Sequence, residues 1–180
     1  MDFLELLRLS RFTGLQAGWI FYCPIMPKKK NTSQKANPVV PALRQVVADS
    51  YAIIGQTHIC HWNVRGPNFF SLHMAFEEQY TELFQAVDEI AERIRALGAL
   101  APGGLGNLAK MAGIKEVAED TTATKMVEHL VQANKTLVAD LVKARDAAAK
   151  FGDNETEDLM IARIQVHEKT IWMLESFLGA

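Results

Sequence analysis

The sequence predicts an all-α protein, a bundle of four long helices with one long crossover between the second and the third. Apolar residues recur at steps of three and four along most of the chain, and no stretch shows the strict alternation of a half-buried strand. A segment rich in glycine and proline, residues 98–121, is long enough to cross a bundle. The length of 180 residues, 49% of them hydrophobic and 22% charged, suits one domain with a sizeable core.

The first long helix is predicted over residues 41–64, after Pro38 and Pro41. Its inward stripe, which ends in two histidines, consists of Leu43, Val46, Val47, Ile53, Ile54, His58 and His61. The next four residues, Arg65-Gly66-Pro67-Asn68, have the composition of a turn.

The second helix has the clearest pattern and is predicted over residues 70–97, with Gly98 as its stop. Its apolar stripe consists of Phe76, Tyr80, Leu83, Val87, Ile90, Ile94 and Leu97. The other expected elements are a short helix at about 105–112 in the crossover, a third long helix from about 122 to 151, and a fourth from about 155 to 178.

The first 25 residues read differently from the rest of the chain. Their loosely apolar run is shorter than a membrane span and is broken by glycine, glutamine and proline, which excludes a transmembrane helix. Three interpretations stay open: a leader or annotation error ahead of a true start at Met26, a signal or targeting segment, and a genuine extension. The predicted organisation is a non-native leader or targeting-like segment over 1–25, a basic flexible tail over 26–40, and the bundle over 41–180.

The tail carries four lysines and no acid between residues 27 and 37, which is typical of a disordered segment. The lysines are Lys28, Lys29, Lys30 and Lys35. The formal net charge of the whole chain is -2, so the body is not a basic nucleic-acid binder. Two cysteines, Cys23 and Cys60, are too few for a disulfide framework and indicate a reducing compartment.

One flank of the second helix carries candidate metal ligands. At ~100° per residue, His73, Glu77, Asp88 and Glu92 fall beside the apolar stripe. Phe84 and Ala91 share this flank, which predicts that something covers it. Another set of side chains is expected on the opposite, solvent side: Glu78, Glu82, Glu89 and Arg93.

Distance limits how these ligands can combine. His73 with Glu77, and Asp88 with Glu92, are each one helical turn apart, so either pair can share an ion. The two pairs are separated by ~22 Å along the helix, whereas metal–ligand bonds are ~2 Å. Either the chain holds two half-sites, or an antiparallel two-fold partner brings its Asp88 and Glu92 to His73 and Glu77. His61 joins from the first helix.

Imidazoles mixed with carboxylates suit iron, manganese or zinc, and the excess of carboxylates favours iron over a structural zinc. Taken singly, each residue is more simply a solvated acid or a structural histidine; five positions that fit one two-fold site favour the metal hypothesis. No glutamate is followed by histidine three residues later, which argues against a di-iron site inside a single bundle.

Two segments, HWNVRGPNFFSLH at 61–73 and DEIAERI at 88–94, resemble the Dps family (DNA-binding protein from starved cells), the miniferritins. The likeness runs from about Pro38 to Leu178 and includes the ending IWMLESFL. It implies a ferritin-like bundle whose ferroxidase site lies between two-fold-related subunits, with His61, His73, Glu77, Asp88 and Glu92 as ligands. The family usually has aspartate at the position of Glu77, which makes Glu77 the least certain ligand.

The resemblance also implies a hollow homododecamer that oxidises Fe(II), preferably with hydrogen peroxide, stores ferric iron and protects DNA, in the cytoplasm and associated with the nucleoid. Trp62 matches a tryptophan thought to intercept stray oxidants, with a packed aromatic as the alternative. Asp158 matches a pore aspartate, with a solvated helix start as the alternative. Non-specific DNA binding would rest on the four tail lysines. Two other functions stay open: a non-catalytic nucleoid protein that compacts DNA through this tail, and a helical oligomer with vestigial ligands.

Overall fold

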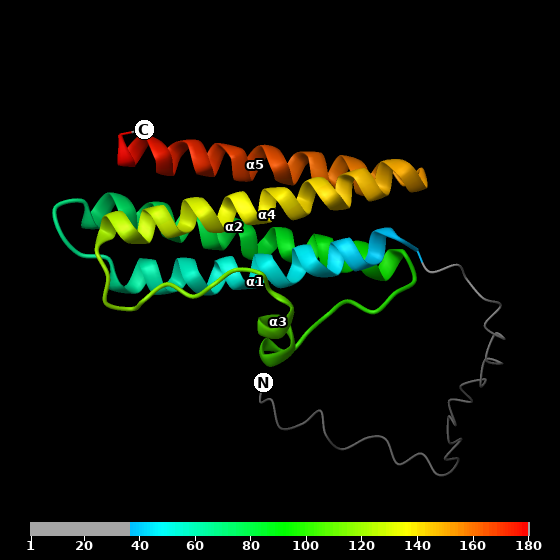
Figure 1. The fold of residues 1–180 in the computed structure, drawn as a ribbon, viewed down its shortest axis with the longest axis horizontal. Helices are drawn as coiled ribbons and strands as arrows, with labels where there is room; N and C mark the ends of the chain where they lie inside the picture. Colours follow the sequence, from blue (N-terminus) through cyan, green and yellow to red (C-terminus); the bar gives the residue numbers. More distant parts are fainter. Residues whose placement is uncertain (1–36, 180) are drawn as a thin grey trace, which may run out of the picture. The chain divides into compact units, whose positions relative to one another are not determined.

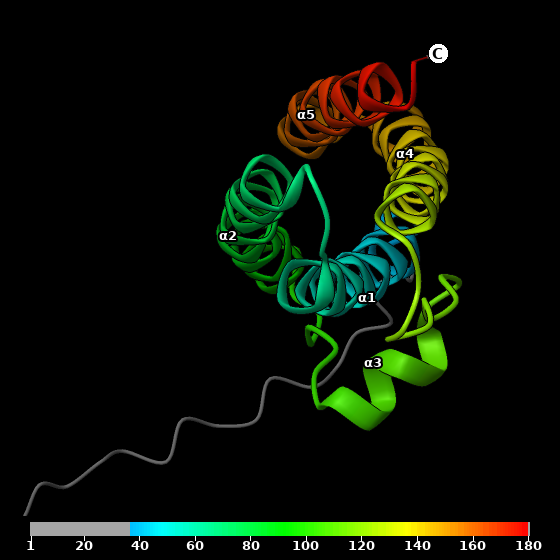
Figure 2. The same ribbon diagram turned by 90° about the vertical axis from the view of Figure 1, so that its left-hand side faces the viewer.

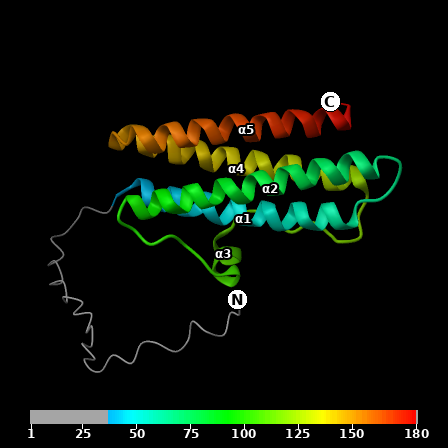
Figure 3. The same cartoon turned by 180° about the vertical axis from the view of Figure 1, so that it is seen from behind.

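The structure, a computed structural model, describes residues 37–179, which form five helices and no strand (Figure 1). In chain order the helices are α1 (Val39–Asn63), α2 (Phe69–Ala96), α3 (Leu105–Met111), α4 (Ala123–Phe151) and α5 (Asn154–Leu178). The four long helices lie side by side, and the short α3 lies outside them in the crossover from α2 to α4 (Figures 1 and 3). The predicted all-α four-helix bundle with a short crossover helix is confirmed.

The apolar stripes of the four long helices meet in the middle of the bundle. Seen from the end, α1 packs against α2 and α4, and α4 packs against α5, whereas the contact of α2 with α5 is the smallest between neighbouring long helices (Figure 2). The largest fully buried side chains include Phe76, Ile90 and Ile94 of α2 and Leu130, Leu137 and Leu141 of α4. The α2 residues among them belong to the stripe that the sequence predicts, so burial of this stripe positions the polar flank beside it.

The first helix begins two residues before the expected start. The Asn37 side chain accepts a hydrogen bond from the Val39 amide at 2.9 Å, and Pro41 lies in the first turn, where no backbone donor is needed. Val39, expected at the end of the basic tail, is fully buried. The rest of the predicted tail up to residue 36, and the whole leader segment 1–25, lie outside the described residues.

A sharp turn joins α4 to α5. Gly152 ends α4 with a φ of 78°, a left-handed conformation that favours glycine. Asp153 then caps α5 by accepting a hydrogen bond from the Thr156 amide at 3.1 Å. No helix among residues 37–179 is long and apolar enough to cross a membrane.

The crossover is fastened to α1 by buried polar side chains. The Asp49 carboxylate accepts a hydrogen bond from the Gly113 amide at 2.7 Å, and the Gln56 side chain accepts one from the Val117 amide at 2.6 Å. Burial raises the pKa of Asp49, and the nearby Asp140 acts in the same direction. These bonds satisfy backbone donors of a segment that has little helix of its own.

Candidate metal centre

The turn between α1 and α2 brings two histidines face to face. His61 lies in the last turn of α1, and His73 lies near the start of α2, which returns antiparallel to α1. Gly66 has a φ of 110° in this turn and its carbonyl accepts the Phe69 amide at 3.0 Å, which starts the second helix. The tight reversal is what places residues 61 and 73 opposite each other.

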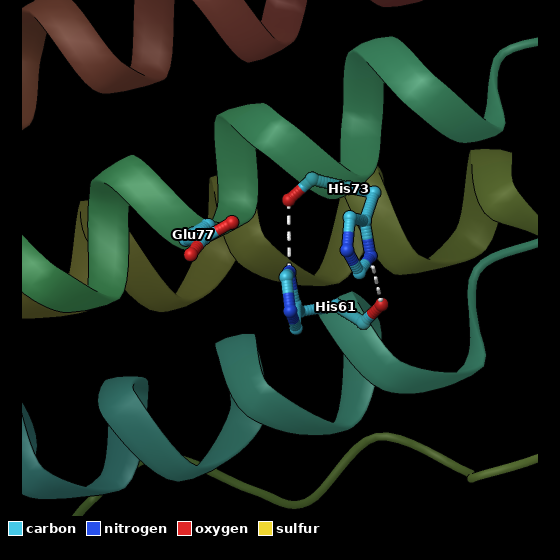
Figure 4. Close-up of side chains that lie close together, drawn as sticks. All are labelled: His61, His73 and Glu77. Atoms are coloured by element: carbon cyan, nitrogen blue, oxygen red, sulfur yellow. Dashed lines mark hydrogen bonds between the residues drawn. The ribbon is translucent and has the colours of Figure 1, made fainter.

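His61 and His73 fix each other's rings. The Nδ1–H of His61 donates to the carbonyl of His73 at 2.8 Å, and the Nδ1–H of His73 donates to the carbonyl of His61 at 2.9 Å (Figure 4). The ring centroids are 3.7 Å apart and the planes differ by 18°. Because a carbonyl oxygen only accepts, Nδ1 carries the proton in each neutral ring and Nε2 keeps its lone pair. Both imidazoles are thereby held in the form that binds a metal through Nε2.

Glu77 completes a group of three. It follows His73 by one turn of α2, and one possible ligand atom from each of His61, His73 and Glu77 lies within 4.8 Å of the others (Figure 4). His61 is buried, His73 half-buried and Glu77 exposed, so the group opens toward the surface. Two imidazoles and a carboxylate fit Fe(II), and they also fit Mn(II) or Zn(II).

The other two predicted ligands do not join this group within one chain. Asp88 and Glu92 are exposed on the same flank of α2, ~22 Å further along at ~1.5 Å per residue. Neither forms an ion pair with another of the described residues. Phe84 stands between the two groups of ligands with 60% of its surface exposed. One chain therefore assembles three of the five predicted ligands.

The flank expected to face only solvent meets α5 instead. Glu82 pairs with Arg163 of α5 through both carboxylate oxygens. Arg93 reaches the cap of the same helix, with its Nε donating to the Thr156 hydroxyl at 2.8 Å and a terminal nitrogen 2.5 Å from Asp153. The prediction that Glu82 and Arg93 face only solvent was wrong. This side of α2 faces α5, and the two helices are far enough apart for long side chains to bridge them. Glu78 and Glu89 are exposed, as expected.

The interior of the bundle holds a polar network in place of a second cluster of metal ligands. The buried His167 of α5 donates from Nδ1 to the Asn134 side chain at 2.8 Å and lies 3.2 Å from a terminal nitrogen of Arg163. Burial, with a smaller contribution from Arg163, lowers the pKa of His167 to about 3. Among residues 37–179 the group at His61 is the only one in which three or more His, Cys, Asp or Glu side chains lie close enough to share a metal ion.

The remaining predicted residues lie as follows. Trp62 is 67% exposed, and its ring lies parallel to that of His58 at 5.0 Å. Within the chain the ring therefore packs only in part, and both interpretations of Trp62 stay predictions. Asp158 is exposed near the start of α5, whereas Asp153 in the same acidic turn is a buried helix cap. The tail lysines 28, 29, 30 and 35 lie outside the described residues.

The aromatic rings around the site were not predicted, and Phe69 stacks on His73 with centroids 5.0 Å apart. Tyr80 lies edge-on to His61 with centroids 5.3 Å apart, and it also contacts His58 at 4.2 Å. Burial, and then the proximity of His61, lower the pKa of His58. The spacing of three residues from His58 to His61 could have indicated that His58 lies near the site. The signal was ambiguous, because apolar residues of the core stripe recur at the same spacing.

A family model described as a ferritin-like domain matches residues 40–180. The DNA protection during starvation protein of Brevibacillus brevis is 39% identical over 140 residues, which cover 78% of this chain and 94% of that protein. The chain belongs to the Dps family of ferritin-like proteins. Its membership agrees with the resemblance seen in the motifs at 61–73 and 88–94.

Solved structures of other Dps proteins superpose on this one. Dps from Staphylococcus aureus is 41% identical, with a TM-score of 0.75, and the match covers 78% of this chain and 94% of that one. Dps from Vibrio cholerae O1, described as a member of a broad superfamily of ferritin-like diiron-carboxylate proteins, is 34% identical with the same TM-score and covers 78% and 88%. The match to these Dps structures therefore covers more than three quarters of the chain.

Proposed function

We propose that this Dps-family chain is a ferroxidase that oxidises Fe(II), its substrate, at a site shared by two copies of the chain, and stores the ferric product in a hollow homo-oligomer. The observation that carries the proposal is the group of His61, His73 and Glu77, in which two imidazoles are fixed with Nε2 free. The ferritin-like match and the diiron-carboxylate description of the Vibrio cholerae protein support iron as the metal.

The sharing between copies is argued from one register along α2. An antiparallel partner that sets its Glu92 opposite His73 also sets its Asp88 opposite Glu77, because both pairs are centred between residues 82 and 83. A single two-fold axis at that point therefore completes two identical sites at once. Each site would hold two imidazoles from one chain and two carboxylates from the other, with Glu77 between them.

The residues have separate tasks in this proposal. His61 and His73 bind Fe(II) without first having to reorient, because their rings are already fixed. Glu77 and the partner's Asp88 and Glu92 balance the charge of two Fe(II) ions and keep them close together. Two Fe(II) ions then give one electron each to hydrogen peroxide, whose O–O bond breaks and which takes up two protons to form two waters. Delivering both electrons together makes the one-electron step that releases hydroxyl radical a minor route.

The experiment separates the two halves of the site. One variant carries His61→Ala with His73→Ala, and the other carries Asp88→Ala with Glu92→Ala. Each alone is expected to lose most of the iron oxidation seen when Fe(II), loaded anaerobically, meets peroxide. When the two are assembled together, a mixed pair holds one intact site and one empty one, so random pairing restores about a quarter of the sites.

A matched control replaces Glu78 and Glu89, two exposed acids of α2 away from the ligand flank, by alanine. This control is expected to oxidise iron at the wild-type rate. Wild-type rates in either ligand variant would show that the site is assigned to the wrong residues. No recovery in verified mixed assemblies would show that the site is not shared between copies.

DNA protection is proposed as a second role on a separate observation, the basic tail. The Brevibacillus brevis relative is named for DNA protection during starvation, and residues 27–37 of this chain carry four lysines and no acid. Tails gathered on one oligomer would bind phosphates without sequence preference and weaken steeply with salt. Deleting residues 26–37 is expected to abolish gel shifts at low salt while iron oxidation continues. Gel shifts that survive the deletion would exclude the tail as the DNA-binding element.

A further inference from the structure

The exposed flank of α2 carries an aromatic side chain that has no role in binding metal. Phe84 is 60% exposed and stands between the predicted ligands of the two ends, in line with Glu77, Thr81 and Asp88. We infer that Phe84 is the apolar anchor of the contact between two copies of this chain, and that it inserts into a hollow between α1 and α2 of its partner.

The hollow lies beside Phe84 on the same face. Its other walls are Ile54 and His58 of α1 and Tyr80, Thr81 and Gln85 of α2, and its volume is about 200 Å³. The lining is mainly apolar, and Phe84 is one of its residues. Because a cavity of ~150 Å³ accommodates a benzene ring, this hollow has room for the ring of another phenylalanine.

The pairing of the proposed metal ligands between two copies indicates which side chain fills the hollow. The two-fold axis that pairs His73 with the partner's Glu92, and Glu77 with the partner's Asp88, passes between residues 82 and 83. The same axis sets Phe84 opposite the partner's Thr81, which is a wall of the hollow. Phe84 and the wall residue Thr81 thus lie on either side of the axis and close to it. The Phe84 ring of each copy can therefore fill the hollow of the other copy in the same contact.

Charge favours the same arrangement. The Asp88 and Glu92 end of the flank is acidic and, among the described residues, has no cation paired with it. The His61 and His73 end carries no acid except Glu77 and becomes positive when it holds Fe(II). Antiparallel pairing brings opposite ends together, with the apolar Phe84 region at the centre and polar groups outside it.

This inference rests on the proposed shared site, but its test is independent of metal. Phe84→Ala and Phe84→Glu, in the full-length chain without metal, are examined by analytical ultracentrifugation and native mass spectrometry across a range of concentrations. The dissociation constant of the two-fold pair is expected to rise at least tenfold for alanine and more for glutamate, which sets two like charges near the axis. The chain should keep its helical circular dichroism, since the ring contributes little to its own core.

The matched control is Phe151→Ala, a half-exposed phenylalanine at the end of α4. It is expected to leave the two-fold dissociation constant unchanged. Wild-type association of both Phe84 variants would overturn the anchor and leave the metal site standing. If the Phe84 variants associate more weakly but the wild-type protein does not oxidise iron, the proposed function is wrong and the role of Phe84 in the contact is still supported. Phe84→Ala should regain oxidation at high protein concentration, whereas Asp88→Ala with Glu92→Ala should not.

A second measurement tests the register while Phe84 is kept. Thr81→Cys, in a chain with Cys23 replaced by serine, places two thiols a few ångströms apart along the proposed helix pair. A short bis-maleimide is expected to link them into a covalent dimer. Glu92→Cys in the same background places the thiols ~28 Å apart along the helices and should give no dimer. Equal yields from both positions, or none from Thr81→Cys, would reject the register.

Discussion

The side chains of His61 and His73 each donate a hydrogen bond to the other residue's backbone carbonyl, at 2.8 and 2.9 Å. This reciprocal arrangement ties the end of α1 to the start of α2 and sets the tautomer of both rings. The same two hydrogen bonds therefore hold the helix ends together and orient the imidazoles for binding a metal. Half of the proposed iron site is already in place within a single chain.

Glu77→Gln tests the third member of that group. The amide keeps the shape of the side chain but loses the charge and one oxygen ligand, so metal affinity should fall by at least roughly tenfold. Cobalt(II), added as a spectroscopic substitute for Fe(II), gives the affinity from its absorption bands. Glu78→Gln, the exposed neighbour, is the matched control and should bind cobalt as the wild type does. An unchanged affinity in Glu77→Gln would remove it from the ligand set.

His167 should make the stability of the bundle depend on pH. Burial lowers its pKa to about 3, whereas an unfolded chain titrates near ~6.5. Between these values the unfolded state binds the additional proton, so stability falls as the pH drops below about 6.5 and the loss continues toward the folded pKa. The thermal midpoint of the metal-free protein at fixed concentration is the measurement.

His167→Gln is the variant for that measurement. It should melt lower than the wild type at neutral pH, because buried partners of the histidine lose hydrogen bonds. Its midpoint should also change less between pH 6.5 and 5. His58 and His129, whose pKa values are also lowered by burial, remain in both proteins. They contribute equally to the slope of thermal midpoint against pH in the wild type and in the variant. Equal slopes in the two proteins would show that His167 is not the group responsible.

Asp153→Ala removes the cap of α5 together with the partner of Arg93. Burial alone would raise the pKa of Asp153, but hydrogen bonds from Thr156 and then the Arg93 guanidinium outweigh it and lower the pKa. A carboxylate of this kind stabilises the protein above its unfolded pKa of ~3.9 and loses that effect as the pH falls. We expect a loss of about 1–2 kcal/mol at pH 7. The difference from wild type in urea unfolding should shrink below pH 4, and a constant difference would contradict the prediction.

The helices and half of the site could be predicted from the sequence because both depend on spacing within a segment. The three- and four-residue steps of α2 placed its ends within one residue, and the stripe of the first helix that ends in His61 put this residue in the same candidate site as His73. Distance along α2 also separated Asp88 and Glu92 from the histidines. These inferences require only the geometry of one helix and one tight turn.

The predictions that were wrong or missing concern contacts with other helices, which the sequence pattern of one helix does not specify. Projection around α2 gives the direction of Glu82 and Arg93 but does not say that α5 lies there, so their ion pairs could not be predicted. The hydrogen bonds between His61 and His73 depend on the depth of the turn. The burial of the cap residue Asp153 could not be predicted either, because its partner Arg93 lies 60 residues away in sequence.

Trp62→Phe separates protection against radicals from iron oxidation. Trp62 follows His61 in the sequence, and its indole ring is 67% exposed and stacked on His58, so it can give up an electron to an oxidant that escapes the site. We expect an unchanged rate of Fe(II) oxidation by peroxide and a several-fold rise in spin-trapped hydroxyl radical. Because the ring is exposed, the substitution should change stability by no more than ~0.5 kcal/mol. Trp172→Phe is the matched control, since Trp172 is 64% exposed on α5, which contributes nothing to the site. Equal radical yields in Trp62→Phe and the wild type would leave Trp62 without a protective role.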